Sequence, residues 1–219
     1  MLKILLEFWR RKRFKRAKDA WFRHCGDDTL RLDYPLTANS IVFDVGGYQG
    51  DFAAAIHARF KCQVHVFEPV AFFREQMAVR FAGLPKIIIH PFGLAAADGQ
   101  VRMNLAAESS SHVKPADQSG ELCELRAFSA VAESLGVGEI SLMKVNIEGA
   151  EFELIEHILD RSWAARIVDL QVQFHLFVPD AAARRRNLRR RLRGTHQPTY
   201  EYYFIWENWR RRVSTTGPI

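Results

Sequence analysis

Two acidic residues and a glycine turn near the start of the chain have types and spacing that suit ligand binding. Asp44 lies in an apolar run over residues 41–45, and Glu68 follows it 24 positions later. Between them, Gly46 and Gly50 give the turn conformational freedom and let a ligand approach the backbone. In α/β domains an acid at the end of the second strand accepts hydrogen bonds from both hydroxyls of a ribose. These residues therefore predict a nucleotide or nucleoside pocket at the carboxyl ends of two parallel strands.

The spacing of the glycines limits the classes of ligand that this turn could bind. A dinucleotide fingerprint that begins at Gly46 needs glycines where Tyr48 and Asp51 stand. A P-loop needs a Gly-Lys-Ser/Thr ending, which this turn does not have. A turn that binds no pyrophosphate needs less glycine, so an adenosyl ligand without phosphates fits better. The alternative is an ordinary tight turn followed by an exposed Glu68.

A second polar cluster follows a predicted strand at residues 140–147. Lys144 and Asn146 share one face of that strand because side chains alternate along it. Glu148 and Glu151 are predicted in the first turn of the next helix, on one side of it. In a doubly wound sheet this junction opens onto the ligand crevice, so Glu148 is a candidate catalytic residue. The alternative is that both acids only stabilise the helix N terminus through its macrodipole.

His175 ends the polar face of a predicted strand at residues 167–177, in which apolar and polar side chains alternate. A histidine with a pKa near neutrality is a natural base for an acceptor hydroxyl. The alternative is a structural histidine that forms a hydrogen bond beside Gln173. A strand with one polar face in an α/β sheet is expected at an edge or along a cleft. His112 and His196 are predicted loop residues and are weaker candidates.

These side chains need an α/β framework, which the apolar periodicity predicts. Strands are predicted at 41–45, 61–67, 87–89, 140–147 and 167–177, and helices at 51–59, 71–81, 128–135, 148–159 and 181–193. Strands that alternate with helices at this spacing indicate right-handed βαβ units and a parallel sheet. A short extra strand is predicted at 101–105, and an aromatic strand pair at 200–209. Residues 106–120 are polar and turn-rich, typical of a lid over a site or of a plain surface loop.

The net charge of +6 is unevenly distributed along the chain. Residues 1–23 carry nine Lys or Arg and two acids, and residues 184–193 carry seven Arg and no acid. The remainder has 15 basic and 23 acidic residues, so the body of the protein is acidic. The composition therefore argues against a general nucleic-acid-binding face.

Each basic segment has more than one interpretation. Residues 1–23 are typical of a basic amphipathic helix that docks on an anionic membrane surface, or of a helix that packs on its own domain. The arginines of residues 184–193 could recognise an anionic acceptor, such as a phosphorylated or acidic glycan, or a membrane surface. Alternatively, they form a solvated face.

Cysteine usage and hydropathy indicate a cytoplasmic protein. Cys25, Cys62 and Cys123 are widely spaced with no CxxC pair, which is typical of reduced thiols and argues against a zinc site. No apolar run approaches the ~18 residues needed to span a bilayer. The first residues also lack the cleavage pattern of a signal peptide, so neither secretion nor a membrane span is expected.

Several blocks of sequence resemble a known family. Phe-Asp-Val-Gly-Gly-Tyr-Gln-Gly (43–50), Val-Phe-Glu-Pro (66–69) and Met-Lys-Val-Asn-Ile-Glu-Gly-Ala-Glu (143–151) are similar to the ordered blocks of the FkbM family of S-adenosylmethionine (SAM)-dependent methyltransferases. Gln-Val-Gln-Phe-His (171–175) and Trp-Glu-Asn-Trp (206–209) resemble a bacterial, polysaccharide-associated branch of that family. The order of the blocks makes the resemblance specific.

The resemblance covers residues 38–210 and implies a fold, a donor and an acceptor. It implies an α/β, Rossmann-like class I methyltransferase domain with a doubly wound, mostly parallel seven-stranded sheet. Residues 1–37 would form a basic helix and lead-in, and residues 211–219 a C-terminal tail. The donor would be SAM, and the acceptor a hydroxyl on a carbohydrate, a polysaccharide precursor or a related small molecule. Such an enzyme would work in the cytoplasm or at the inner face of the membrane.

The matching positions define an expected site. The residues expected to bind the cofactor are Asp44, Gly46, Gly47, Tyr48, Gly50, Glu68 and Pro69, and those expected to be catalytic are Glu148, His175, Asn146 and Lys144.

Two positions depart from the family pattern. Tyr48 stands where the first block often has Asn, and it could cover the methionine part of the donor or simply pack. Asn146 stands where the third block usually has Asp, which removes a candidate base or metal ligand, so no metal is predicted. Two other functions remain open. One is a non-catalytic module that keeps the fold at a membrane surface, and the other is an NAD-dependent oxidoreductase, which the glycine spacing disfavours.

Overall fold

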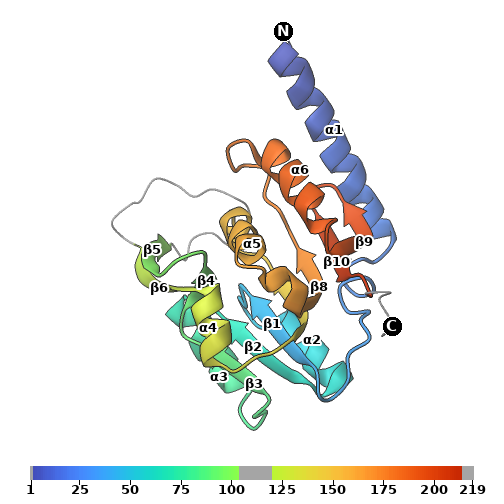
Figure 1. The fold of residues 1–219 in the computed structure, drawn as a ribbon. Coiled ribbons are helices and arrows are strands. Elements are labelled where there is room, and N and C mark those ends of the chain that lie inside the picture. The colour runs from blue at the N-terminus through green and yellow to red at the C-terminus, as the bar shows by residue number, and fades with distance from the viewer. Residues whose placement is uncertain (1, 104–119, 214–219) are drawn as a thin grey trace.

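The computed structural model describes residues 2–103 and 120–213, which form an α/β domain with a long N-terminal helix (Figure 1). The predicted lid or surface loop at 106–120 lies almost entirely outside the described residues, together with His112 and most of the predicted tail.

The described chain runs in order through α1 (Leu2–Arg23), β1 (Ile41–Val45), α2 (Asp51–Phe60), β2 (Gln63–Phe67), α3 (Ala71–Arg80), β3 (Ile87–His90), β4 (Gly93–Ala95), β5 (Gly99–Met103), β6 (Glu121–Ala127), α4 (Phe128–Ser134), β7 (Ile140–Val145), α5 (Glu151–Asp160), the 3-10 helix η1 (Trp163–Arg166), β8 (Ile167–Val172), α6 (Ala181–Leu192), β9 (His196–Tyr202) and β10 (Trp206–Arg211).

Seven strands form the main sheet in the order β3-β2-β1-β7-β8-β10-β9. Neighbours among β3, β2, β1, β7 and β8 pair in parallel, and β10 is antiparallel to both β8 and β9. The predicted α/β class with a mostly parallel seven-stranded sheet is therefore confirmed. From β1 the chain moves outward to β3 and then crosses to β7, so the strand order reverses between β1 and β7. Ligands of open α/β sheets bind at such a reversal, beyond the carboxyl ends of the strands.

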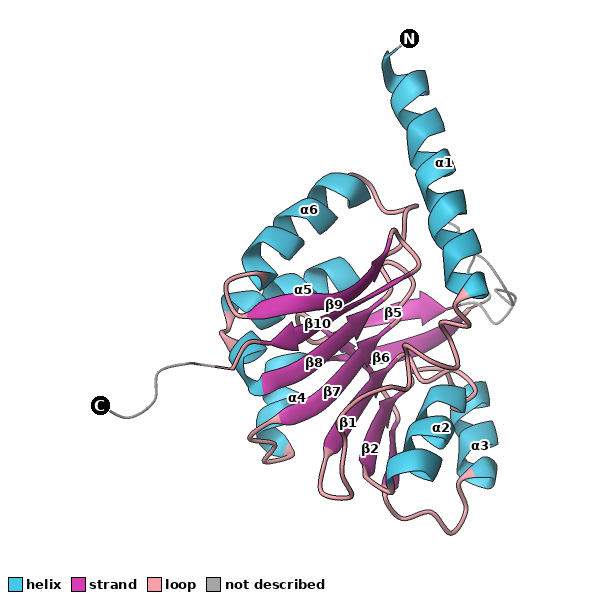
Figure 2. Cartoon of the chain, turned by 90° about the vertical axis from the view of Figure 1, so that its right-hand side faces the viewer, coloured by secondary structure: helices cyan, strands magenta, loops and turns pink. Residues whose placement is uncertain are grey.

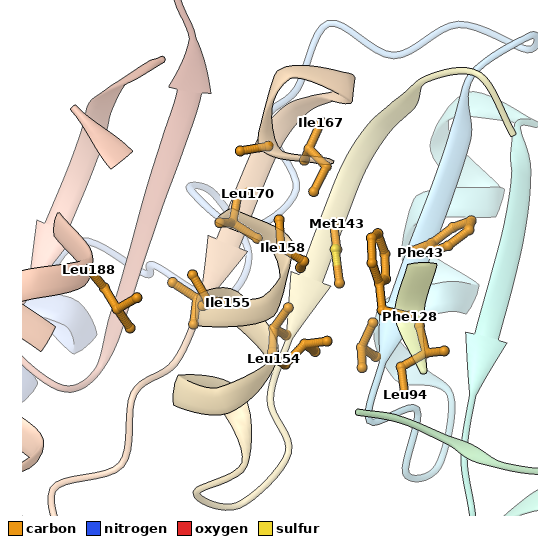
Figure 3. Packing of buried hydrophobic residues seen from close by; sticks show 14 of the residues in the cluster. Phe43, Leu94, Phe128, Met143, Leu154, Ile155, Ile158, Ile167, Leu170 and Leu188 are labelled. Carbon is orange, nitrogen blue, oxygen red and sulfur yellow. The ribbon is translucent and has the colours of Figure 1, made fainter. Parts of the chain in front are cut away.

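Helices cover both faces of this sheet, with α2 and α3 on one side and α4, α5 and α6 on the other (Figure 2). The alternation of β1 requires this arrangement. Phe43 and Val45 pack in the core that includes α4 and α5, whereas Val42 packs in the core that includes α2. Figure 3 shows Phe43 close to Phe128 in the first of these cores. Because β1 is buried on both faces, its position is fixed by hydrophobic packing rather than by the ligand pocket.

A small second sheet has the strand order β4-β6-β5. The extra strand expected at 101–105 is present as β5, two residues earlier, but β4 and β6 have no counterpart in the sequence-based expectations. The N–H of Ala71 donates to the Glu121 carboxylate at 3.0 Å, which joins the start of β6 to the start of α3. This sheet therefore supports the helix that follows Glu68.

The expectations for residues 148–177 need two corrections. The helix expected to start at Glu148 begins at Glu151, because Glu148 and Gly149 have φ values of +51° and +110° that break a helix. The strand expected at 167–177 ends at Val172 and lies inside the sheet, between β7 and β10, rather than at an edge. Its polar face is buried, since the Asp169 carboxylate accepts a hydrogen bond from the Asn208 amide at 2.8 Å.

The N-terminal helix is joined to the domain through its C-terminal half. Trp21 is 2% exposed and packs edge-on against Tyr202 of β9, with ring centroids 5.1 Å apart. Phe14 and Ala17 also pack against the main core. The first turns of α1 instead extend away from the sheet and its helices (Figures 1 and 2). Within the described residues, no helix is both long and apolar enough to cross a membrane.

Candidate active site

The glycine turn after β1 is closely packed against the ends of β2 and β7. Gly46 has φ +87° and Gly50 φ +80°, in the left-handed region that favours glycine. A Cβ on Gly46 would lie 2.0 Å from the carbonyl oxygen of Asn146, and one on Gly47 would lie 2.2 Å from the Val66 side chain. The turn therefore has no room for side chains at these two positions.

A buried ion pair lies beside the turn. The Lys144 ammonium donates to Asp44 Oδ1 at 2.8 Å and to the carbonyl oxygen of Gly46 at 2.6 Å. Both side chains are buried, so the lysine amine is committed to holding the turn. Among the described residues, Asp44 Oδ2 and Asn146 Oδ1 are buried atoms without a hydrogen-bond partner. An unsatisfied buried acceptor costs about 1–3 kcal/mol, so these two oxygens are well suited to accept hydrogen bonds from a ligand.

Glu68 is 5% exposed, so the alternative of an exposed glutamate is wrong. Its Oε2 accepts a hydrogen bond from the Tyr48 N–H at 2.8 Å, and its Oε1 accepts one from the Val70 N–H at 2.9 Å. Burial raises the pKa of this carboxyl and outweighs the two hydrogen bonds and the nearby Lys144, which lower it. Glu68 thereby joins the glycine turn to the start of α3. Each carboxylate oxygen keeps a second lone pair that a ligand hydroxyl can use.

Tyr48 and Pro69 lie on the two loops that Glu68 joins. The Tyr48 ring packs against Phe73 of α3, with ring centroids 4.5 Å apart, and 44% of the residue is exposed. A Cβ on Gly93 would lie 3.5 Å from Pro69, so the first residue of β4 sits against the proline. Packing against α3 therefore accounts for one side of Tyr48 and leaves the remainder of its ring accessible.

Glu151 holds His175 in a fixed orientation. Glu151 is fully buried, and its Oε1 accepts from the backbone N–H of His175 at 2.7 Å and lies 2.8 Å from the imidazole Nδ1. Its Oε2 accepts from the Gly149 N–H at 2.8 Å. An ionised carboxylate only accepts hydrogen bonds, so the Nδ1 of a neutral His175 carries the proton and Nε2 keeps its lone pair.

The free nitrogen of His175 faces a second acid. Glu148 Oε2 lies 3.6 Å from His175 Nε2, and the Glu148 side chain is 57% exposed. Burial lowers the pKa of His175, but the hydrogen bond that its ring donates to Glu151 and the charges of both acids outweigh burial and hold this pKa above its ordinary value. The cluster is therefore a histidine that accepts a proton readily, with one buried and one accessible carboxylate beside it.

The structure brings together residues that the sequence placed on separate elements. His175 lies beyond the end of β8, and its partner is Glu151 rather than Gln173. Glu151 is not among the residues expected to be catalytic, although its spacing of three from Glu148 was a usable signal. Asn146 follows β7 directly, and its N–H donates to the carbonyl oxygen of Val45 at 3.0 Å. The two expected groups, for cofactor binding and for catalysis, thus meet at the same edge of the sheet.

His196 is not a loop residue. It begins β9, is fully buried, and its Nε2 lies 3.0 Å from the carbonyl oxygen of Ile167. Burial lowers its pKa, so it is a neutral structural histidine.

Four of the seven arginines in residues 184–193 form ion pairs with neighbouring elements. Arg185 and Arg189 are buried and form ion pairs with Glu201 of β9 and Glu207 of β10. Two further arginines of α6 pair with acids of α5. These four side chains attach α6 to its neighbours, whereas Arg186, Arg190 and Arg193 are exposed.

No group of three or more His, Cys, Asp or Glu side chains in the described parts of the chain is arranged to hold a metal ion. The three cysteines are free thiols, with Cys25 exposed and the other two buried.

Comparisons with known proteins identify the fold. No family model and no curated protein sequence matches the chain. Among solved structures, the FkbM methyltransferase of Methylobacillus flagellatus KT gives a TM-score of 0.56 at 13% identity, over 80% of this chain and 44% of that chain. SMU.1697c, a proposed methyltransferase from Streptococcus mutans in complex with SAH, gives a TM-score of 0.51 at 9% identity, over 87% of this chain and 97% of that chain. The chain has the Rossmann-like methyltransferase fold. It spans less than half the length of the FkbM structure.

Proposed function

We propose that this protein binds SAM at the glycine turn and transfers its methyl group to a hydroxyl of a carbohydrate or a related small molecule. One observation supports the proposal most strongly: three features lie together at one edge of the sheet. They are the closely packed glycine turn, the two buried oxygens of Asp44 and Asn146 that lack a hydrogen-bond donor among the described residues, and the His175 ring that Glu151 orients. The three sequence blocks that resemble the FkbM family lie at the carboxyl ends of β1, β2 and β7, where such a site is expected.

The residues at the turn suit the parts of this donor. Asp44 Oδ2 is a buried acceptor for the donor's ammonium group, and the small size of Gly46 and Gly47 lets the turn pack closely against the ends of β2 and β7. Glu68 keeps lone pairs for the two ribose hydroxyls while it holds the turn. Lys144 takes no proton from the acceptor in this scheme, because its ammonium holds Asp44 and the turn.

His175 is the proposed base. When bound, the donor supplies an electrophilic methyl group. Nε2 of His175 takes the proton of the acceptor hydroxyl, and Glu151 stabilises the imidazolium that results. In this scheme Glu148, whose exposed side chain lies 3.6 Å from Nε2, accepts a hydrogen bond from the molecule that is methylated. Alignment of acceptor and donor supplies much of the acceleration in such transfers, so a moderate base is sufficient and Asn146 in place of Asp is compatible with activity.

The acceptor class rests on the resemblance of residues 171–175 and 206–209 to a polysaccharide-associated branch. Part of this resemblance has a packing explanation. Gln171 and Asn208 are buried in a polar network with Tyr34, and Glu207 pairs with the α6 arginines. The proposed acceptor therefore depends on the family resemblance rather than on contacts of these side chains.

Methyl transfer tests the proposal directly. The full-length protein would be incubated with methyl-labelled SAM and glycan extracts, and the glycans analysed by mass spectrometry. We expect label in a methyl ether of a glycan or small polyol, and loss of that label in His175→Ala. Retained SAM binding with no labelled product from any extract would instead identify a non-catalytic relative that keeps the fold.

A further inference from the structure

The apolar and basic residues of α1 are separated along the helix axis. Of residues 2–9, six are Leu, Ile, Phe or Trp, whereas residues 10–18 contain seven Lys or Arg and no acid. The first turns of the helix extend away from the sheet in both views (Figures 1 and 2). The apolar segment therefore lies farther from the body of the protein than the basic segment does.

Two large aromatic residues in this projecting part are exposed to solvent. Phe8 is 57% exposed and Trp9 is 55% exposed, and their rings meet edge to face with centroids 6.0 Å apart. The Lys12 ammonium lies 5.4 Å from the Trp9 ring. Exposed aromatics beside long basic side chains are typical of the interface between membrane and water, where rings sit at the headgroups and ammonium groups reach the phosphates.

The base of α1 is fixed to the domain, whereas basic side chains farther along the helix are exposed to solvent. Trp21 anchors the helix against β9, and its indole N–H donates to Asp27 at 3.0 Å. Lys15 and Arg16 are exposed, in contrast to the buried and paired Arg185 of α6. Outside residues 1–23 the chain has 22 Lys or Arg and 23 Asp or Glu, so its net positive charge is concentrated in α1, which an anionic surface attracts.

We propose that α1 docks this protein on an anionic phospholipid bilayer, with residues 2–9 at the boundary of headgroups and acyl chains and residues 10–18 against lipid phosphates. The axial order favours this partner over two others. A nucleic acid would use the basic segment and leave the apolar one unexplained, and a second copy of α1 would bring seven like charges against seven. Each Lys or Arg held near an anionic membrane strengthens binding by about fivefold.

Vesicle flotation with the full-length protein tests this docking. We expect binding to phosphatidylcholine vesicles that contain about 30% phosphatidylglycerol, little binding to pure phosphatidylcholine, and a decrease with added salt. The variant Lys15→Glu/Arg16→Glu should bind at least about 25-fold more weakly. Its matched control is Arg186→Glu/Arg193→Glu, which reverses two exposed charges at α6 and should leave binding unchanged.

The aromatic contribution has its own matched pair of variants. Trp9→Ser should weaken vesicle binding severalfold, whereas Phe72→Ser, at an exposed phenylalanine of α3, should not. Circular dichroism melts check that each variant is folded. The proposal is overturned if the wild-type protein ignores anionic vesicles, if the α1 variants and their controls bind equally, or if sedimentation shows that α1 instead forms a dimer without lipid.

Discussion

Glu151→Gln is the substitution that separates a positioned base from an ordinary structural histidine. The carboxylate is fully buried and takes part in three interactions, with the His175 backbone N–H, the His175 Nδ1 and the Gly149 N–H. Glutamine keeps the shape and one acceptor oxygen. It removes the negative charge, and it turns an N–H₂ group toward the N–H of Gly149.

The magnitude follows from these contacts. Hydrogen bonds to a charged group contribute about 1.5–3 kcal/mol each, and those to a neutral amide about 1 kcal/mol. The partly buried N–H of Gly149 is also left without an acceptor, which costs up to about 1–3 kcal/mol. We therefore expect a loss of about 2–4 kcal/mol in the free energy of unfolding. A domain with a total stability of about 5–15 kcal/mol stays folded after such a loss.

The pH dependence of the free energy of unfolding gives a second, independent measurement of the Glu151–His175 interaction. The pKa of His175 is raised above its ordinary value of 6.5 in the folded protein. The charged form therefore contributes stability that is fully present below pH 6.5 and is lost as the pH rises through the raised pKa. In Glu151→Gln the largest favourable partner loses its charge, so the pKa of His175 falls and the decline moves to lower pH.

The assay is an NMR titration of the His175 ring, together with urea denaturation at several pH values. Glu148→Gln is the matched control, because that acid is more than half exposed and lies 3.6 Å from the imidazole. It should change stability by less than about 0.5 kcal/mol. An unchanged His175 pKa in Glu151→Gln, or equal losses of stability in the two variants, would show that Glu151 does not position and charge-stabilise His175.

Three further predictions concern the glycine turn, the buried ion pair beside it and the ion pairs of α6. Gly46→Ala should abolish donor binding measured by calorimetry, because the new Cβ would lie 2.0 Å from a backbone carbonyl oxygen. Gly83→Ala is its control, since Gly83 has a similar positive φ but no atom within 4 Å of the new Cβ, and it should leave binding intact. Lys144→Met should cost about 3–5 kcal/mol in urea denaturation, because it leaves the buried Asp44 carboxylate unpaired, and a loss below about 1 kcal/mol would contradict the buried pair. Arg185→Met should lower the free energy of unfolding by a similar amount and leave donor affinity unchanged, because it breaks a buried ion pair. Arg186→Met, at an exposed position, should stay within about 0.5 kcal/mol of wild type, and equal losses in the two variants would contradict the structural role of Arg185.

The main sheet could be predicted from the sequence because its strands are short apolar runs bounded by turn residues. The expected strand at 41–45 matches β1 residue for residue, and the helix expected at 71–81 differs from α3 by one residue. The small sheet could not be predicted in this way. β4 spans only three residues, and in β6 only Cys123 is buried, so neither segment has an apolar pattern.

The sequence did not predict where β8 ends or which strands flank it, because both depend on residues far away in the chain. Side-chain alternation continues past Val172, but pairing with β10 stops there, where Glu207 faces Val172. The edge position was wrong because the β9–β10 hairpin adds two strands outside β8. The polar side chains of β8 were expected to line a cleft because their hydrogen-bond partners, such as Asn208, lie far along the chain and cannot be paired with them from local sequence.

The candidate site could be predicted in composition but not in its hydrogen bonds. Family-like blocks placed Asp44, Glu68 and Glu148 near one edge of the sheet. They did not show that the Glu68 carboxylate accepts hydrogen bonds from two backbone N–H groups, or that Glu151 forms a hydrogen bond with His175, 24 residues later in the chain. Such contacts depend on where β8 ends and on the left-handed Glu148, which no local periodicity reports.

The most direct test of the central claim is isothermal titration of the purified protein with SAM, SAH and NAD. We expect SAM and SAH to bind at one site per chain and NAD not to bind. We also expect that Glu68→Gln, folded by circular dichroism, loses roughly tenfold or more in SAM affinity, because the ribose hydroxyls lose a charged acceptor. Heat from NAD but none from SAM or SAH, or a SAM affinity that Glu68→Gln leaves unchanged, would contradict this claim.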